Sequence, residues 1–216
     1  RYETLFPYTT LFRSEPAPAF IARHIMENPP KEITIVATAP LSNIAMALLL
    51  EPAIAGRIRE LVIMGGAVGV GNITPSAEFN FYADPEAARI VFSSGAPITL
   101  VPLDVTRTVT LTNKRLARLS KIPGAVSGYF TASMTCYSAA CAKYIGESAS
   151  MHDPCCIAWL EDPSAFTCEK KYITVETDGT LTQGKTVVNV FGVLDKEPNI
   201  NLVTAINEQR FWTLLE

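Results

Sequence analysis

Residues 78–88 read EFNFYADPEAA, and the rest of the chain is organised around them. The second half of this stretch predicts the start of a helix, with Asp84 at the N-cap and Pro85 at the first helical position. In the first half, Glu78 and Asn80 are two residues apart, so on an extended backbone both side chains point to one side and the flanking phenylalanines to the other. A carboxylate beside an amide suits the hydroxyls of a sugar. The alternative is a loop in which Glu78 caps a nearby backbone.

Short apolar runs alternate with helical segments along the chain. Runs rich in β-branched residues, typical of strands buried in a parallel sheet, lie at residues 33–37, 61–64 and 98–101. Helices are expected at residues 19–27, 40–50, 84–94, 112–120 and 126–144, and from residue 153 onward. A hairpin is expected from residues 172–176 and 185–190, with a last strand at 202–206 before a closing helix. This alternation predicts an α/β fold with an open, mostly parallel sheet flanked by helices.

Ligands of such sheets bind beyond the carboxyl ends of the strands. This rule puts Thr38, Met64 and the loop of residues 65–80 on one rim of the sheet. The loop is rich in glycine, but it matches no phosphate-binding motif and no helix is expected directly after it, so we reject a phosphate-binding role. For Thr38 and Met64, the alternative to a functional role is packing at the strand ends.

The composition restricts the class of protein. The chain has 216 residues, 48% hydrophobic and 18% charged, which predicts one globular domain rather than a disordered chain. A net charge of -3 without a basic cluster indicates no nucleic-acid partner, and no apolar run approaches the roughly 20 residues of a membrane-spanning helix. The odd count of five cysteines and the absence of a signal peptide favour a reducing cytoplasm.

Residues 1–14, RYETLFPYTTLFRS, fit nothing that follows them. They are rich in aromatic residues, lack a clean periodicity and carry no helix cap. We predict that this segment is foreign and replaces a lost native start, and that the domain proper covers residues 15–216.

His152 and Asp153 stand together before a helix that Asp153-Pro154 is expected to start in the same way as Asp84-Pro85. The other histidine, His24, lies in a helix near the start and is expected to be solvated. A helix N-terminus disfavours imidazolium, so a partner would have to set the proton affinity of His152. Taken alone, the pair is explained equally well by a capping aspartate beside a structural histidine.

Several blocks together resemble the inosine–uridine-preferring nucleoside hydrolase family and occur in the order of that family. They are VATAPLSN at residues 36–43, VIMGG at 62–66, residues 72–88, PLDVT at 102–106 and HDP at 152–154. The resemblance covers roughly residues 15–216. It implies that the chain is an enzyme that cleaves the N-glycosidic bond of a small-molecule ribonucleoside with water, using one Ca²⁺.

The resemblance also implies roles for single residues. Asn72, Glu78 and Asn80 would bind the ribose hydroxyls, with Met64 against the sugar. These contacts would strengthen as the sugar approaches an oxocarbenium ion.

For the metal and the leaving base, the resemblance implies three further positions. Thr38 would offer its backbone carbonyl to Ca²⁺ and Asp153 its carboxylate, which would also contact the substrate; hard oxygen ligands are those that Ca²⁺ prefers. His152 would protonate the departing base.

One feature of the family is missing. The family begins with a strand carrying a D-x-D-x-x-x-D-D cluster, which supplies most of the calcium carboxylates and the base that activates water, whereas the first aspartate here is Asp84. We therefore predict a chain that lacks the first strand or strands of the fold and is weakly active or inactive, because losing a general base costs about 10²–10⁴ in rate. The alternatives are a non-catalytic nucleoside- or ribose-binding protein, or a subunit that pairs through an exposed sheet edge. We expect a homo-oligomer, a dimer or a tetramer.

Base preference rests on two tyrosines. Tyr137 and Tyr144 are seven residues apart, two helical turns, and so share one face of a helix rich in polar residues. They can stack on a base or hydrogen-bond to it, or they can simply pack. The sequence around HDPC, followed by IAWL at 157–160, looks closer to family members that act on pyrimidine ribonucleosides.

Overall fold

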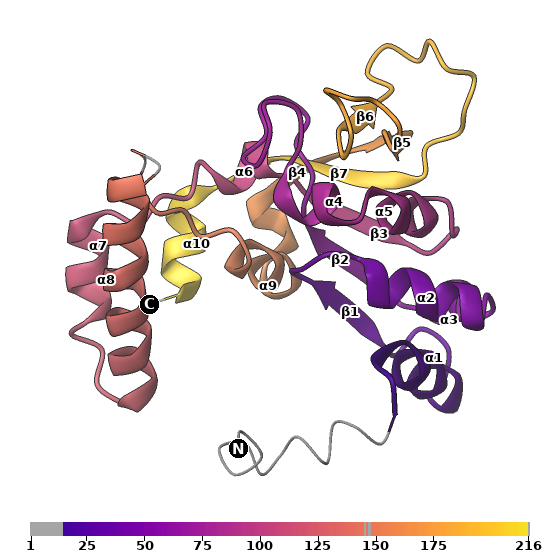
Figure 1. Cartoon of the computed structure of the whole chain (residues 1–216). Helices are drawn as coiled ribbons and strands as arrows, with labels where there is room; N and C mark the ends of the chain where they lie inside the picture. The colour runs from indigo at the N-terminus through magenta and orange to yellow at the C-terminus, as the bar shows by residue number, and fades with distance from the viewer. Residues whose placement is uncertain (1–14, 145, 147, 216) are drawn as a thin grey trace, which may run out of the picture.

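A central sheet with helices on both faces forms the body of the described chain, residues 15–144, 146 and 148–215 of a computed structural model (Figure 1). Within these residues the main sheet has five strands in the order β1-β2-β3-β7-β4. The first four run parallel, and β4 pairs antiparallel with β7 at one edge. The strands are β1 (Thr34–Ala37), β2 (Glu60–Met64), β3 (Ile98–Val101), β4 (Phe166–Lys171) and β7 (Ile200–Ile206). The prediction of an α/β fold with a mostly parallel sheet is confirmed.

The helices fall into two groups. Those that pack on one face are α1 (Ala17–Glu27), α2 (Ser42–Leu50), α3 (Ile54–Arg57) and α5 (Pro85–Phe92). Those that pack on the other are α6 (Leu103–Thr106), α7 (Asn113–Leu119), α8 (Ala125–Tyr144), α9 (Pro154–Glu161) and α10 (Glu208–Leu215). The remaining elements are α4 (Phe79–Ala83), a 3-10 turn at Pro163–Ala165 and the hairpin of β5 (Ile173–Val175) and β6 (Thr186–Val188). The predicted helices and the predicted hairpin are all present.

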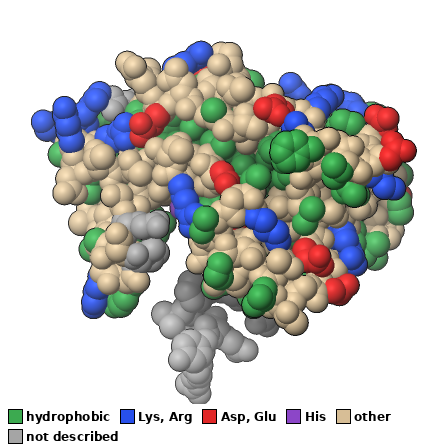
Figure 2. All heavy atoms as spheres, turned by 90° about the horizontal axis from the view of Figure 1, so that it is seen from above, with side chains coloured by type: hydrophobic (Ala, Val, Ile, Leu, Met, Phe, Trp, Pro, Cys, Tyr) green, Lys and Arg blue, Asp and Glu red, His purple; other side chains and the backbone are tan. Residues whose placement is uncertain are grey.

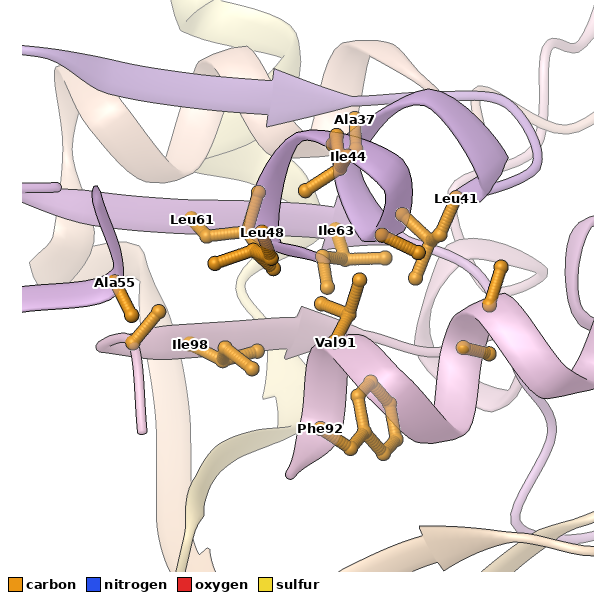
Figure 3. Close-up of a cluster of buried hydrophobic side chains, with 14 of the residues drawn as sticks. Ala37, Leu41, Ile44, Leu48, Ala55, Leu61, Ile63, Val91, Phe92 and Ile98 are labelled. Carbon is orange, nitrogen blue, oxygen red and sulfur yellow. The ribbon is translucent and has the colours of Figure 1, made fainter. Parts of the chain in front are cut away.

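Both faces of the sheet are buried, because successive side chains of a strand point to opposite sides. Leu61 and Ile63 of β2 pack into a cluster with α2 and α5, part of which Figure 3 shows. Val62 and Met64 pack into a second cluster with α9 and α10. A strand covered on both faces reads as a continuous apolar run, which is why these runs predicted strands correctly.

Strand β4 was not predicted. Its sequence, FTCEKK, carries three charged residues, and Thr167, Glu169 and Lys170 are exposed. An edge strand tolerates such residues because one of its sides meets water. Local propensity therefore gives little sign of it.

The prediction of an extended backbone at residues 78–80 is wrong. Glu78 has an extended backbone, but it is the N-cap of α4, and Asn80 is helical. Side chains two apart on a helix point to nearly opposite sides, so Phe81 is fully buried whereas Phe79 is 51% exposed. The alternative in which Glu78 caps a nearby backbone is therefore the correct local description.

The two Asp-Pro starts also differ. Asp84 caps α5, since its Oδ1 accepts from the N–H of Ala87 at 3.0 Å. Helix α9 begins at Pro154 as predicted, but the Asp153 side chain makes no capping hydrogen bond. The Asp153 carboxylate is thus not used to hold its own helix.

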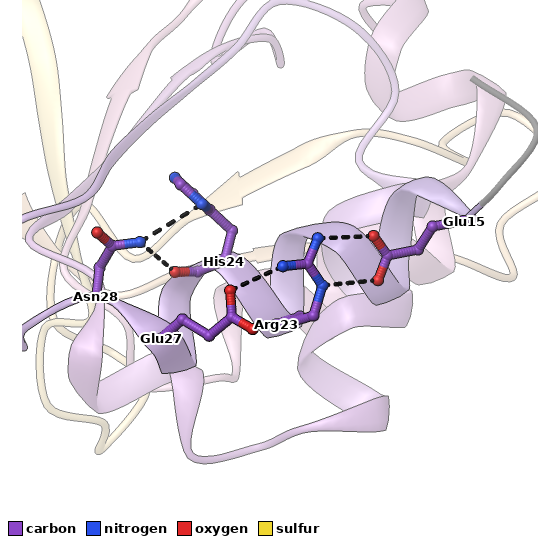
Figure 4. Close-up of polar contacts among 5 residues, drawn as sticks. All are labelled: Glu15, Arg23, His24, Glu27 and Asn28. Atoms are coloured by element: carbon purple, nitrogen blue, oxygen red, sulfur yellow. Dashed lines mark hydrogen bonds and ion pairs between the residues drawn. The ribbon is translucent and has the colours of Figure 1, made fainter. Parts of the chain in front are cut away.

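A group of polar and charged side chains runs along α1, from Glu15 before its start to Asn28 at its C-cap (Figure 4). The Arg23 guanidinium donates to both carboxylate oxygens of Glu15, at 3.0 and 2.9 Å, and to Glu27 at 2.7 Å. His24 is exposed beside them, with Nδ1 3.4 Å from Asn28 Nδ2. Exposed ion pairs add little stability, and this cluster is a solvated helix face.

Among the helices of the described residues, none combines the length and apolar character that crossing a membrane requires.

Candidate functional site

The carboxyl ends of β1 and β2 bring two predicted site residues to one rim. The strands pair in parallel with Ala37 opposite Ile63, so Thr38 and Met64 follow at the same level. Beyond β2 the chain continues along β3, where the Gly65 N–H donates to the Val101 carbonyl at 3.4 Å. The loop after β2 therefore starts at the sheet, as expected for a ligand-binding rim.

Glu78 is a buried carboxylate, 3% exposed, held against the end of β2. Its Oε2 accepts from the N–H of Gly66 and its Oε1 from the N–H of Asn80, both at 2.9 Å. Burial raises the pKa of Glu78, the N–H donors of Asn80, Gly66 and Phe81 oppose this, and the negative charge of Asp153 raises it further. A carboxylate has about four acceptor positions, so capacity remains for a ligand hydroxyl.

Asn80 joins Glu78 to Met64. Its Nδ2 donates to the Met64 carbonyl at 3.0 Å and lies 3.7 Å from the Met64 sulfur. The structure thus brings together three of the four residues predicted to hold a sugar. The fourth, Asn72, is exposed on the loop, and its Oδ1 accepts from the N–H of Phe79 at 2.9 Å, which ties the loop to the start of α4.

Three charged side chains, which the sequence reading did not single out, hold the loop segment 68–71. Asp104 accepts from the N–H groups of residues 68 and 69 at 2.7 and 2.8 Å. Arg107 donates to the carbonyls of residues 70 and 71 at 2.9 and 2.8 Å, and Lys185 to those of 68 and 69 at 2.6 and 2.7 Å. This charged clamp, Asp104, Arg107 and Lys185, fixes the backbone that leads to Asn72. Its signals in the sequence are the position of Asp104 within PLDVT and that of Lys185 within TQGKTVV at residues 182–188, which also resembles a late strand of the family.

Gly71 is required by the same loop. A side chain there would collide with the backbone of Thr74 and Ala77. The Gly71 N–H donates to the Pro75 carbonyl at 3.1 Å, and the Asn72 N–H to the Ala77 carbonyl at 3.0 Å. The loop is therefore closed on itself directly before Glu78.

His152 lies at a separate cavity of about 330 Å³ between α8 and the start of α9. Its Nδ1 is 2.7 Å from the hydroxyl of Thr106, which is fully buried. The cavity is lined by Phe130, Met134, Tyr137, Ser150, Met151, His152, Asp153 and Pro154. In Figure 2, a notch separates the lobe at the left, which α7 and α8 form, from the main body.

The two predicted tyrosines have different surroundings. Tyr137 lines the cavity beside His152, and burial, a hydrogen bond with Cys141 and the charges of Cys141 and Asp153 raise its pKa to about 12. Its phenol is therefore neutral near pH 7 and able to donate. Tyr144 is 75% exposed, with the Lys143 ammonium 4.8 Å from its ring centroid, and it is not part of the cavity lining. Of the two tyrosines, Tyr137 is the one that lines this cavity.

Asp153 connects the two parts of the site. It lines the cavity of His152 and also a larger apolar cavity, about 590 Å³, that Thr38 and Val36 line from β1. Asp153 is an exposed residue, and the partial burial of its carboxyl raises its pKa. Thr38, Asp153 and His152 are thus brought into one region from β1 and from the start of α9.

The predicted calcium ligands do not form a calcium site by themselves. Ca²⁺ takes six to eight oxygen ligands. In the part of the chain that the structure describes, no group of three or more His, Cys, Asp or Glu side chains is placed to hold a metal. The Thr38 carbonyl and the Asp153 carboxylate are the donors that the sequence predicted, and they leave most of the coordination sphere to other groups.

Comparisons with known proteins point to one family. The family model described as inosine-uridine preferring nucleoside hydrolase matches residues 4–213. The chain is similar to the pyrimidine-specific ribonucleoside hydrolase RihB of Shigella flexneri serotype 5b, with 40% identity over 186 residues, which cover 86% of this chain and 59% of that protein.

Two solved structures share the fold. A plant nucleoside hydrolase superposes with a TM-score of 0.88 at 31% identity, over 94% of this chain and 66% of that one. A purine-preferring ribonucleoside hydrolase from Gardnerella vaginalis superposes with a TM-score of 0.85 at 30% identity, over 93% and 64%. The chain spans less than two thirds of the length of each of these relatives.

Proposed function

This chain belongs to the inosine-uridine preferring nucleoside hydrolase family, and from that premise we propose that it acts on the N-glycosidic bond of ribonucleosides, releasing ribose and the free base. The observation that carries the proposal is the buried Glu78 carboxylate, fixed by two backbone N–H groups beside Asn80 and Met64 at the end of β2. A rigid acceptor of this kind suits a pentose hydroxyl. The family membership supplies the reaction, and the geometry supplies the sugar contact.

The sugar contact has a catalytic consequence. As the glycosidic bond breaks, positive charge develops on the sugar and its hydroxyls become better hydrogen-bond donors. An ionised Glu78 then binds the transition state more tightly than the ground state, which is the condition for lowering the barrier. Because Glu78 is held before the substrate arrives, little reorganisation is needed.

The leaving base needs a proton. We place the base in the cavity that His152 lines, where Tyr137 offers a neutral phenol. We assign proton donation to His152 and a hydrogen bond to the base to Tyr137. Similarity to RihB, named as pyrimidine-specific, supports uridine and cytidine as the preferred substrates.

Low turnover by this chain is part of the proposal. The carboxylates that the described residues bring to Thr38 are too few for tight Ca²⁺ binding, so no step is assigned to the metal. The same observation favours the second candidate, a protein that binds nucleosides without cleaving them. A homo-oligomeric state and a cytoplasmic location are further proposals, which light scattering and cell fractionation test.

The experiment measures base release from uridine, cytidine and inosine by chromatography, with and without added Ca²⁺, using long incubations. His152→Asn and Glu78→Gln should each lower release, the first by up to about 10²–10⁴, the worth of a general acid. The matched controls are His24→Asn and Glu86→Gln, which change an exposed histidine and an exposed glutamate.

The outcomes separate the candidates. Release that falls in both site variants and is retained in both controls supports hydrolysis. Release that survives both site variants refutes the assigned site. Calorimetric binding of uridine without any release supports the binding protein, and fast turnover by this chain alone contradicts the low-activity part of the proposal.

A further inference from the structure

Thr106 is the last residue of α6, directly beyond the carboxyl end of β3. Its side chain is fully buried, and its Oγ1 lies 2.7 Å from Nδ1 of His152, a residue 46 positions later in the chain. The second polar atom within reach of the hydroxyl is the Leu103 carbonyl, at 3.4 Å. The Thr106 hydroxyl therefore has His152 Nδ1 as a close partner and the Leu103 carbonyl as a distant one.

We infer that Thr106 is a positioning residue for His152: its hydroxyl donates to Nδ1, so the neutral imidazole carries its proton on Nε2. A hydroxyl has one hydrogen to donate. A separation of 2.7 Å is at the common distance for O–H donors and at the short end of the range of roughly 2.7–3.2 Å for N–H donors, so it favours the hydroxyl as the donor. The bond to the Leu103 carbonyl, at 3.4 Å, is too long to compete for that hydrogen.

This arrangement decides which ring nitrogen serves the reaction, and here the inference rests on the proposed function. Nδ1 is turned toward a side chain with no exposed surface, so exchange of a proton with a substrate falls to Nε2. In the doubly protonated ring that gives a proton to the base, Nδ1–H donates to Oγ1 and the hydroxyl turns toward the Leu103 carbonyl. The Nε2 proton passes to the base nitrogen, and the neutral ring left behind keeps its proton on Nδ1 until Nε2 takes up a proton from solvent. Thr106 can thus hold the ring in one orientation in both states.

The first test reads the tautomer directly and needs no turnover. The chain has two histidines, so long-range ¹H–¹⁵N spectra contain two imidazole patterns, and exposed His24 serves as the internal reference. Spectra are recorded at one pH well above about 6.5, where an ordinary imidazole is neutral. The variants are Thr106→Val, which keeps the shape and removes the hydroxyl, and Thr106→Ser, which restores it. Thr108→Val is the control, because the Thr108 hydroxyl bonds only the Val105 carbonyl among the contacts of this segment, at 2.7 Å.

The expected result is a single Nε2–H pattern for His152 in the wild type, Thr106→Ser and Thr108→Val, and a pattern with a larger share of the Nδ1–H tautomer in Thr106→Val. A His152 pattern that is the same in Thr106→Val and the wild type overturns the inference, and so does an Nδ1–H pattern in the wild type. A folded Thr106→Val with a wild-type backbone spectrum shows that the change is local.

The second test uses turnover. Thr106→Val should lower kcat about 10-fold, less than the 10²–10⁴ that a general acid contributes, while KM stays unchanged and Thr106→Ser recovers the rate. An unchanged kcat overturns the role in catalysis. If the wild type releases no base at all, the proposed function fails, whereas the inference about the His152 tautomer is still decided by the spectra.

Discussion

The N–H of Gly66 donates to Glu78 Oε2 at 2.9 Å, and this bond joins the end of β2 to the start of α4 across the loop between them. It places a buried carboxylate at the rim of the sheet, where each of its two oxygens already accepts from one backbone N–H. The cost of burying that charge is offset in part by the N–H donors, yet the pKa of Glu78 stays raised. A buried carboxylate with a raised pKa, placed at the carboxyl ends of parallel strands, is typical of a functional site.

The raised pKa of Glu78 makes folding stability depend on pH. Between its ordinary pKa, near 4.5, and its higher value in the folded protein, the folded state binds more protons than the unfolded state. The contribution of Glu78 to stability is therefore full below the unfolded pKa and falls as pH rises through the folded pKa. Urea unfolding of the wild type and Glu78→Gln from about pH 4 to 7 should show this fall in the wild type only. Parallel curves would contradict it.

The two phenylalanines of residues 78–82 offer a matched pair. Phe81 is fully buried, packs edge-on against Phe92 at 5.4 Å between ring centroids and lies under Gly65 and Gly66. Phe81→Ala should lower the free energy of unfolding by about 3–5 kcal/mol because it leaves a cavity. Phe79→Ala, at a half-exposed position, should change it by no more than about 0.5 kcal/mol. If denaturant unfolding shows the same loss for both variants, both phenylalanines are buried, as the predicted extended backbone would require.

The charged clamp predicts a local effect on the loop. Asp104→Asn keeps the shape but replaces one acceptor oxygen by a donor group that faces an N–H of residues 68 and 69. We expect a loss of about 1–2 kcal/mol in stability. Amide hydrogen exchange should quicken at residues 68–71, and a change spread over the whole chain would argue against a local clamp. Asp195→Asn, at an exposed aspartate, is the control.

The two tyrosines of α8 should separate in substrate preference. Tyr137→Phe removes a phenol from the cavity of His152 and should change the ratio of uridine to inosine turnover by about 10-fold, the upper range of one hydrogen bond. Tyr144→Phe should leave that ratio unchanged, because Tyr144 lies outside the cavity lining. The measurement is kcat/KM for both nucleosides, and a larger effect at Tyr144 would reverse the assignment.

The secondary structure followed closely from local patterns. β-branched runs at residues 33–37, 61–64 and 98–101 became strands, because each carries apolar side chains to both faces of a covered sheet. Asp84-Pro85 started α5 as its capping chemistry predicts. The places where local patterns failed are those where partners from elsewhere decide the backbone: α4, whose cap Glu78 is also bound by Gly66, and β4, which needs β7 beside it.

The sequence by itself determined the strands β1, β2, β3 and β7, most of the helices, the rim on which Thr38 and Met64 meet and the family to which the blocks belong. Local periodicity and capping govern these features, since they depend on neighbours a few residues away. Only the tertiary structure decided which side chains meet: Thr106 with His152 over 46 positions, Asp104 with Gly69 over 35 and Lys185 with Gly69 over 116. Such contacts depend on how the helices and strands pack against one another, and the spacing of residues along the chain does not predict that packing.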